Sequence, residues 1–182
     1  GYYFAELDTK VIDNKNNSVD IIYNFNLGER AIIKKINFQG KKVFSDSKLR
    51  NIIRSEEGRF WKFITSNKYL DELKIKQDEK RLKQYYQRKG YYNVNVKSSY
   101  AKNINNKFFE LNFNIDSGEK FFFNDISIEI NDDFNKENFV KINNDIKKLK
   151  GKKYSSKIVN KTLDEIDQIL LLRAVSYTHL TL

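Results

Sequence analysis

The sequence repeats itself with a period close to 90 residues, and this repeat restricts the possible architecture more than any other feature. Gly-Tyr-Tyr occurs at residues 1–3 and again at residues 90–92, an offset of 89. Gly-Glu-Arg at residues 28–30 corresponds to Gly-Glu-Lys at residues 118–120, an offset of 90. Two pairs of landmarks in nearly the same register indicate tandem small domains.

One complete repeat can be read from residue 28 to residue 116, and it begins with a strand. Residues 31–38 are rich in isoleucine and roughly alternate apolar with polar side chains, which predicts that strand. A turn is expected at residues 39–42, where Gly40 is free to take a positive φ.

Two helices are predicted after this turn. Asp46 stands where an N-cap would, at the start of a short helix. The apolar side of that helix is expected to be Leu49, Ile52 and Ile53. A longer helix is predicted over residues 67–88, and Gly90 ends it. Its apolar positions are Leu70, Leu73, Leu82, Tyr85 and Tyr86.

Two alternating segments complete the repeat. Residues 92–100 and residues 107–116 predict strands, joined by the polar turn 103–106. The element order is therefore strand, helix, helix, strand, strand. With both helices on one side of a short sheet, the predicted fold class is α+β.

The rest of the chain is interpreted around this unit. Residues 1–27 are expected to be the last strands of a preceding repeat, and residues 117–173 a repeat that lacks its last two strands and is frayed. Its first strand is expected at residues 123–128. Residues 174–182 change character abruptly and resemble a translated sequencing adapter, which sets aside His179, the only histidine. Because the chain starts with Gly and contains no Met, we expect an internal fragment.

Composition excludes several function classes. The formal charge is +10, from 34 basic and 24 acidic residues, but Lys alternates with Asp, Glu and Asn along most of the chain. This pattern indicates a solvated surface, with a basic nucleic-acid-binding module as the alternative. With no Cys, neither a disulfide framework nor a thiolate metal site can form. The longest apolar runs, residues 121–123 and 169–172, are far shorter than the roughly 20 residues of a spanning helix.

Candidate catalytic groups do not form a working set. Asp78 and Glu79 are neighbours on a predicted helix, so their side chains cannot face each other. No nucleophile, base or oxyanion donor accompanies them or Glu56. Residues 45–47 (Ser-Asp-Ser) suit helix capping better than metal binding. We therefore predict no enzymatic activity, no cofactor and no metal site.

Several motifs, in this order, resemble the POTRA domains of the BamA family. They are Ile-Lys-Lys-Ile-Asn-Phe-Gln-Gly at 33–40, Phe-Ser-Asp at 44–46, Tyr69, the acidic-basic-aromatic run at 78–86 and Gly-Tyr-Tyr at 90–92. The resemblance extends over residues 1 to about 173. It implies tandem POTRA domains, each a three-stranded mixed sheet of order 1-3-2 packed on two helices.

The resemblance also implies a function. Proteins of this family fold and insert β-barrel proteins into the outer membrane, so we expect a scaffold at the periplasmic face of that bacterial membrane. Its partners would be unfolded outer-membrane protein clients and accessory lipoproteins, with membrane contact through a barrel missing from this fragment. The Phe-Trp pair at residues 60–61 suggests the middle of the array. A POTRA region of a TamA-type or two-partner secretion transporter is the alternative.

Strand order 1-3-2 would place residues 92–100 at an edge of the sheet, where a client strand can pair with the backbone. The alternative is an edge that its Lys and Asn protect from aggregation. The predicted partner-binding residues are Asn93, Val94, Asn95, Val96, Lys97 and Ser98.

Four aromatic residues near this edge, Tyr85, Tyr86, Tyr91 and Tyr92, could form either a peptide-binding ledge or part of the core. We expect about half of them in the core, because a small domain needs its aromatic side chains for stability.

Overall fold

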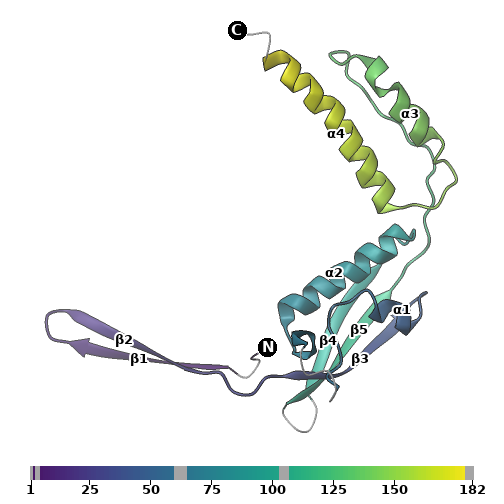
Figure 1. Cartoon of the computed structure of the whole chain (residues 1–182). Coiled ribbons are helices and arrows are strands. Elements are labelled where there is room, and N and C mark those ends of the chain that lie inside the picture. The colour runs from purple at the N-terminus through teal and green to yellow at the C-terminus, as the bar shows by residue number, and fades with distance from the viewer. Residues whose placement is uncertain (1, 3–4, 60–64, 103–106, 179–182) are drawn as a thin grey trace. The chain divides into compact units, whose positions relative to one another are not determined.

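The computed structural model describes residues 2, 5–59, 65–102 and 107–178, which fall into two compact units (Figure 1). Unit 1 comprises residues 1–82 and 96–116, and unit 2 comprises residues 83–95 and 117–182. The Phe-Trp pair of residues 60–61 lies outside the described residues.

A β-hairpin opens unit 1. Strands β1 (Glu6–Asn14) and β2 (Ser18–Asn26) pair antiparallel along their whole length, from Glu6 opposite Asn26 to Asn14 opposite Ser18. The turn between them contains Asn16 and Asn17, with φ of 81° and 55°. Asn tolerates this left-handed region better than most residues, which favours a tight hairpin turn here.

A three-stranded sheet forms the main part of unit 1. Strands β3 (Ile32–Lys41) and β5 (Phe108–Asp116) are parallel, and β4 (Asn95–Lys102) completes the order β3-β5-β4. The five residues between β4 and β5 are too few for a crossover connection, so these two strands run antiparallel and the sheet is mixed. The predicted strand order 1-3-2 and the α+β fold class are confirmed.

The first helix of the sheet unit, α1 (Asp46–Arg50), starts one residue earlier than predicted. Ser45, not Asp46, is the N-cap, so that prediction was wrong. Ser45 has extended backbone angles and its hydroxyl accepts a hydrogen bond from the amide of Lys48. Ile52 and Ile53 lie beyond the end of α1, and Ile53 is nevertheless buried.

The long helix α2 (Glu72–Arg88) begins five residues later than predicted, after the short 3-10 turn η1 (Ser66–Lys68). The Asp71 carboxylate accepts a hydrogen bond from the amide of Lys74, as a capping residue does. The prediction that Leu73 lies on the apolar side of this helix was wrong, because the residue is 78% exposed.

The core of unit 1 lies between the sheet and these helices. Phe38 of β3 stacks on Phe113 of β5 with ring centroids 5.6 Å apart, and the two residues are register partners. Each fully buried side chain of this size contributes about 1.5–3 kcal/mol through removal from water. The other buried apolar residues of the unit include Ile33, Ile36, Leu49, Ile75, Leu82, Phe109, Leu111 and Ile115.

Gly40 has the predicted positive φ, +87°, but lies inside β3 and not in a turn beyond it. A Cβ at this position would lie 2.4 Å from the carbonyl oxygen of Ile115. Glycine is therefore required here for two reasons: the backbone has a positive φ, and β5 leaves no room for a Cβ.

Unit 2 contains helices η2 (Lys136–Phe139), α3 (Val140–Lys147) and α4 (Ser156–Thr178). The strand predicted at residues 123–128 was wrong: this segment forms no strand, and the nearest pairing is a single bridge from Phe122 to Lys153. In unit 1, β3 is held by β5, and no described residue of unit 2 supplies an equivalent of β5.

Helix α4 includes the first five residues of the segment 174–182 that was interpreted as an adapter, whereas His179 lies outside the described residues. Among the described helices, none combines the length and the apolar character needed to cross a membrane.

The strands confirm the internal repeat that the sequence predicts. Adding 90 to the bounds of β2, Ser18–Asn26, gives those of β5, Phe108–Asp116. Their exposure differs: alternate residues of β2 are 50–71% exposed, whereas their equivalents in β5 are 0–1% exposed. The β2 residues are Val19, Ile21, Tyr23 and Phe25, and the β5 residues are Phe109, Leu111, Phe113 and Ile115.

Candidate strand-addition site

The outer edge of β3 is occupied by groups of the same unit. The amide of Ile36 donates to the Glu57 carboxylate at 3.0 Å, and the Ile36 carbonyl accepts from the Arg50 guanidinium at 2.8 Å. The Ile33 carbonyl accepts from the amide of Gly58 at 2.7 Å. These groups make the hydrogen bonds that an added strand would otherwise make, so this edge is a poor template for pairing.

Glu57 is held in its charged form. It pairs with Arg50 at 2.5 Å and with Arg59 at 3.5 Å. Burial acts to raise the pKa of Glu57, but the hydrogen bond from the Ile36 amide and the interactions with Arg50 outweigh it, and the pKa is lowered. Glu57 and Arg50, which bond the Ile36 backbone at the β3 edge, are therefore both charged near neutral pH.

At the opposite edge, β4 contains four of the six predicted partner-binding residues: Asn95, Val96, Lys97 and Ser98. The other two, Asn93 in a turn and Val94 after it, precede the strand, because β4 begins later than predicted. The predicted alternation is confirmed. Asn95 and Lys97 are exposed, whereas Val96 and Ser98 are half-buried on the other face.

A contact at this edge was not foreseen from the sequence. Glu79 of α2 accepts two hydrogen bonds on one carboxylate oxygen, from the backbone amide and from the hydroxyl of Ser98, both at 2.6 Å. The Glu79 side chain is 16% exposed, and Lys76 lies 3.4 Å from its second oxygen. We call this contact the Glu79–Ser98 lock.

Asp78, the sequence neighbour of Glu79, has a different role. It is fully buried and accepts hydrogen bonds at 2.8 Å from the amides of Arg54 and Ser55, and at 2.6 Å from Arg81. The two carboxylates therefore point to different partners and do not form an acid/base pair. Asp78 holds the segment after α1 against α2.

The four tyrosines considered for a ledge have different surroundings. Tyr86 is fully buried, Tyr85 and Tyr91 are half-buried, and Tyr92 is 51% exposed. The Tyr92 and Tyr154 rings form a T-shaped pair at a centroid distance of 5.2 Å, inside unit 2. The prediction that about half belong to the core is consistent with this distribution.

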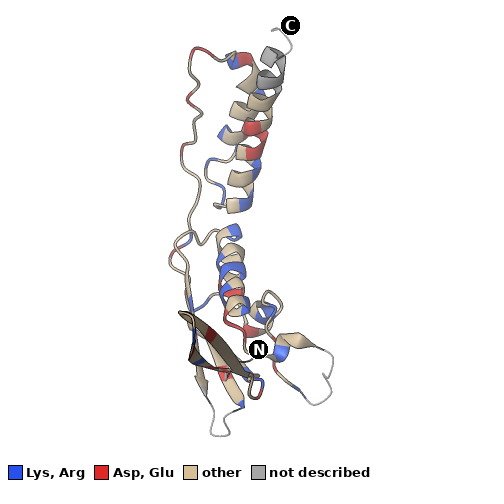
Figure 2. Cartoon of the chain, turned by 90° about the vertical axis from the view of Figure 1, so that its left-hand side faces the viewer, with Lys and Arg blue, Asp and Glu red and all other residues tan. Residues whose placement is uncertain are grey.

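The charged side chains of the described residues do not gather into a patch of one sign. Figure 2 shows Lys and Arg distributed over both units, with Asp and Glu among them. Within this part of the chain, no three His, Cys, Asp or Glu side chains gather where they could hold a metal ion. Ser45 caps α1, and Asp46 pairs with Lys42.

Comparison with known proteins gives a family match to the sheet unit. Residues 31–118 match the POTRA family, described as "Surface antigen variable number repeat". Outer membrane protein assembly factor BamA of Neisseria meningitidis serogroup B is 32% identical over 91 residues, which are 50% of this chain and 11% of that protein. The same factor of Buchnera aphidicola is 27% identical over 132 residues, 65% of this chain and 20% of that protein.

A solved structure shares the fold. The crystal structure of Haemophilus influenzae BamA POTRA3-5 matches with a TM-score of 0.58 at 18% identity, and covers 92% of this chain and 63% of that one. The matched region spans about a tenth to a fifth of the length of the two curated relatives.

Proposed function

We propose that the chain is part of the periplasmic scaffold of an outer-membrane protein assembly factor, because residues 31–118 match the POTRA family and the fold matches a solved POTRA structure. The identity to BamA proteins of two organisms supports this proposal. The scaffold binds unfolded outer-membrane proteins and accessory lipoproteins without catalysing a reaction. Its membrane contact is made by a barrel in the longer parent protein.

Clients bind by adding a strand to the edge of β4. The observation that carries this proposal is a difference between the two edges. On β3, Glu57, Arg50 and Gly58 bond three backbone groups, whereas on β4 Glu79 bonds the Ser98 amide and the side chains of Asn95 and Lys97, on either side of Val96, are exposed. Backbone pairing depends little on client sequence, which suits a factor that handles many clients. Each added hydrogen bond contributes only about 0.5–1.5 kcal/mol, so binding is weak and reversible.

The hairpin supports a tandem arrangement in the parent protein. Residues 1–27 are proposed to be the last two strands of a preceding POTRA domain, because β2 matches β5 in position and pattern but lacks its cover. Residues 117–173 are proposed to start the next domain, and residues 174–182 to be an adapter artefact.

A proline substitution at Val96 tests the edge. In an antiparallel pair, residues two apart direct their amides to the same side, so Val96 shares the outward direction of Ser98, whose amide meets Glu79. Val96→Pro removes this outward amide. We expect it to weaken binding of a labelled peptide of alternating polarity, measured by fluorescence anisotropy, at least about tenfold.

Val96→Ala is the matched control, because it shortens the side chain and keeps the amide. It should bind within about threefold of the parent. Circular dichroism spectra of both variants would be compared with that of the parent to check that they are folded. Equal affinity of a folded Val96→Pro variant would refute strand addition at β4.

The formal charge of +10 is the one observation that favours a nucleic-acid-binding module instead. Such binding would weaken steeply with salt, since phosphate contacts release counterions. Tight binding of a single-stranded oligonucleotide with a steep salt slope, and no binding of the peptide, would favour that function.

A further inference from the structure

The Glu79–Ser98 lock lies on the strand to which the proposed function assigns client pairing. A carboxylate that accepts two hydrogen bonds on one oxygen, both at 2.6 Å, makes strong charge-assisted contacts. One of its two donors is a backbone amide of β4, which is the group that an added strand would have to pair with at this position.

The Glu79–Ser98 lock is formed in this structure, but a client strand could compete with Glu79 for the Ser98 amide. Its anchor, Glu79, projects from α2 and is largely shielded, at 16% exposure. Its second oxygen has Lys76 at 3.4 Å, and the Lys76 side chain is 73% exposed. An exposed ion pair of this kind contributes little, so the contact to Ser98 is what holds the carboxylate in place.

The position of the lock divides the edge. Among the outward amides of β4, that of Val96 lies two residues before the locked one. A client strand can pair at Val96 without disturbing Glu79, but extending the pairing past it requires the carboxylate to leave the Ser98 amide. Releasing this largely shielded carboxylate from its two donors on Ser98 is unfavourable, which opposes that extension.

We propose that Glu79 is a specificity-determining residue that competes with the client for the Ser98 amide and so limits strand addition to a short segment ending near Val96. This inference rests on the proposed client pairing at β4. It adds that the β4 edge binds a client weakly and over few residues. The partner is an extended segment of alternating polarity.

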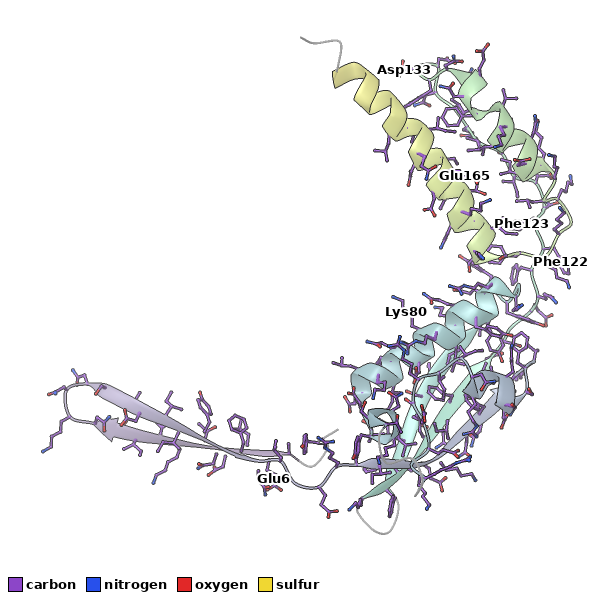
Figure 3. All side chains as sticks on the ribbon, viewed as in Figure 1. Glu6, Lys80, Phe122, Phe123, Asp133 and Glu165 are labelled. Carbon is purple, nitrogen blue, oxygen red and sulfur yellow. The ribbon has the colours of Figure 1, made fainter. Side chains whose placement is uncertain are left out.

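The test compares peptide affinity in variants of the whole chain. Glu79→Ala frees the Ser98 amide, and we expect it to tighten binding of a labelled ten-residue peptide of alternating polarity about five- to tenfold. Glu79→Gln keeps an oxygen acceptor without the charge, so we expect a gain of about two- to threefold. Lys80→Ala is the control: Lys80 is exposed on the same helix (Figure 3), and its variant should bind like the parent.

A second readout separates the lock from a general change in the domain. In amide NMR spectra, the Ser98 signal of the parent should shift little when peptide is added, because the amide stays on Glu79. In Glu79→Ala the same signal should shift strongly. If the alanine variant is unfolded by circular dichroism, Glu79→Gln carries both measurements.

The outcomes distinguish this inference from the proposed function. Peptide binding that Val96→Pro weakens but that both Glu79 variants leave unchanged would overturn the lock and leave strand addition standing. Peptide binding insensitive to Val96→Pro would overturn strand addition, and the lock with it. Tighter binding in Glu79→Ala, lost again in the double variant with Val96→Pro, is the expected result.

Discussion

Replacing Asp78 should destabilise unit 1 more than replacing any surface residue, since this carboxylate is fully buried. Asp78 accepts the amides of Arg54 and Ser55 at 2.8 Å and the Arg81 guanidinium at 2.6 Å. In Asp78→Ala, the two amides lose their acceptor, and a buried donor without a partner costs about 1–3 kcal/mol. Arg81, whose side chain is 26% exposed, can turn toward water.

We therefore expect Asp78→Ala to lower the free energy of unfolding by about 2–6 kcal/mol, since two buried amides lose their acceptor. Asp78→Asn keeps one acceptor oxygen for one of the two amides, so a loss of about 1–3 kcal/mol is expected. The larger loss is a substantial fraction of the roughly 5–15 kcal/mol that stabilises a domain.

Hydrogen exchange under native conditions measures this loss in unit 1 alone. The amides of Leu111 and Phe113 lie in the buried strand β5, so they exchange only when the sheet opens. Their opening free energy should fall by the amounts given above in the Asp78 variants. Lys80→Ala, an exposed position on the same helix, should change it by less than about 0.5 kcal/mol. A loss under about 1 kcal/mol in Asp78→Ala would refute the structural role assigned to this carboxylate.

Two further predictions concern Gly40 and Glu57. Gly40→Ala combines a left-handed backbone with a Cβ 2.4 Å from the Ile115 carbonyl oxygen, and should lower the free energy of unfolding by about 2–4 kcal/mol in urea titrations. Gly151→Ala, at a positive φ with open space around it, should lose only about 1–2 kcal/mol, and equal losses would contradict the steric argument. Because the pKa of Glu57 is lowered in the folded chain, its stabilising contribution is present above the ordinary glutamate pKa and lost as pH falls through the folded value. Glu57→Gln should therefore be less stable than the parent at neutral pH and converge with it in acid, whereas a pH-independent gap would exclude the charged pair with Arg50 as the cause.

The sequence was most informative where local pattern and global fold agree. The strand-helix-helix-strand-strand order, the sheet order and the positive φ of Gly40 were all predictable. Errors arose where neighbouring residues offer equivalent local solutions. Ser45 and Asp46 are both good N-caps, and only the extended backbone at Ser45 decides between them.

The unforeseen contacts of Glu79 and Asp78 with the backbone join residues far apart in the sequence. The Glu79–Ser98 lock joins residues 19 apart, and Asp78 meets amides 23 and 24 residues away. A carboxylate is stable on the buried side of a helix only when it accepts hydrogen bonds there. The periodicity of the sequence does not show which distant residues donate them. The strand expected at residues 123–128 failed for the same reason: a strand needs a partner, and propensity alone does not provide one.

The central claim, that clients add a strand to the β4 edge, is tested most directly by amide NMR of the whole chain titrated with an unfolded outer-membrane protein segment. We predict that shift changes concentrate at residues 95–97 and that amide exchange slows at Val96, with Ser98 held by Glu79 and with β3 unaffected at Ile36, where Glu57 and Arg50 already bond the backbone. Changes centred on β3 or on residues 117–178, with residues 95–97 unchanged at a saturating concentration of the segment, would contradict it.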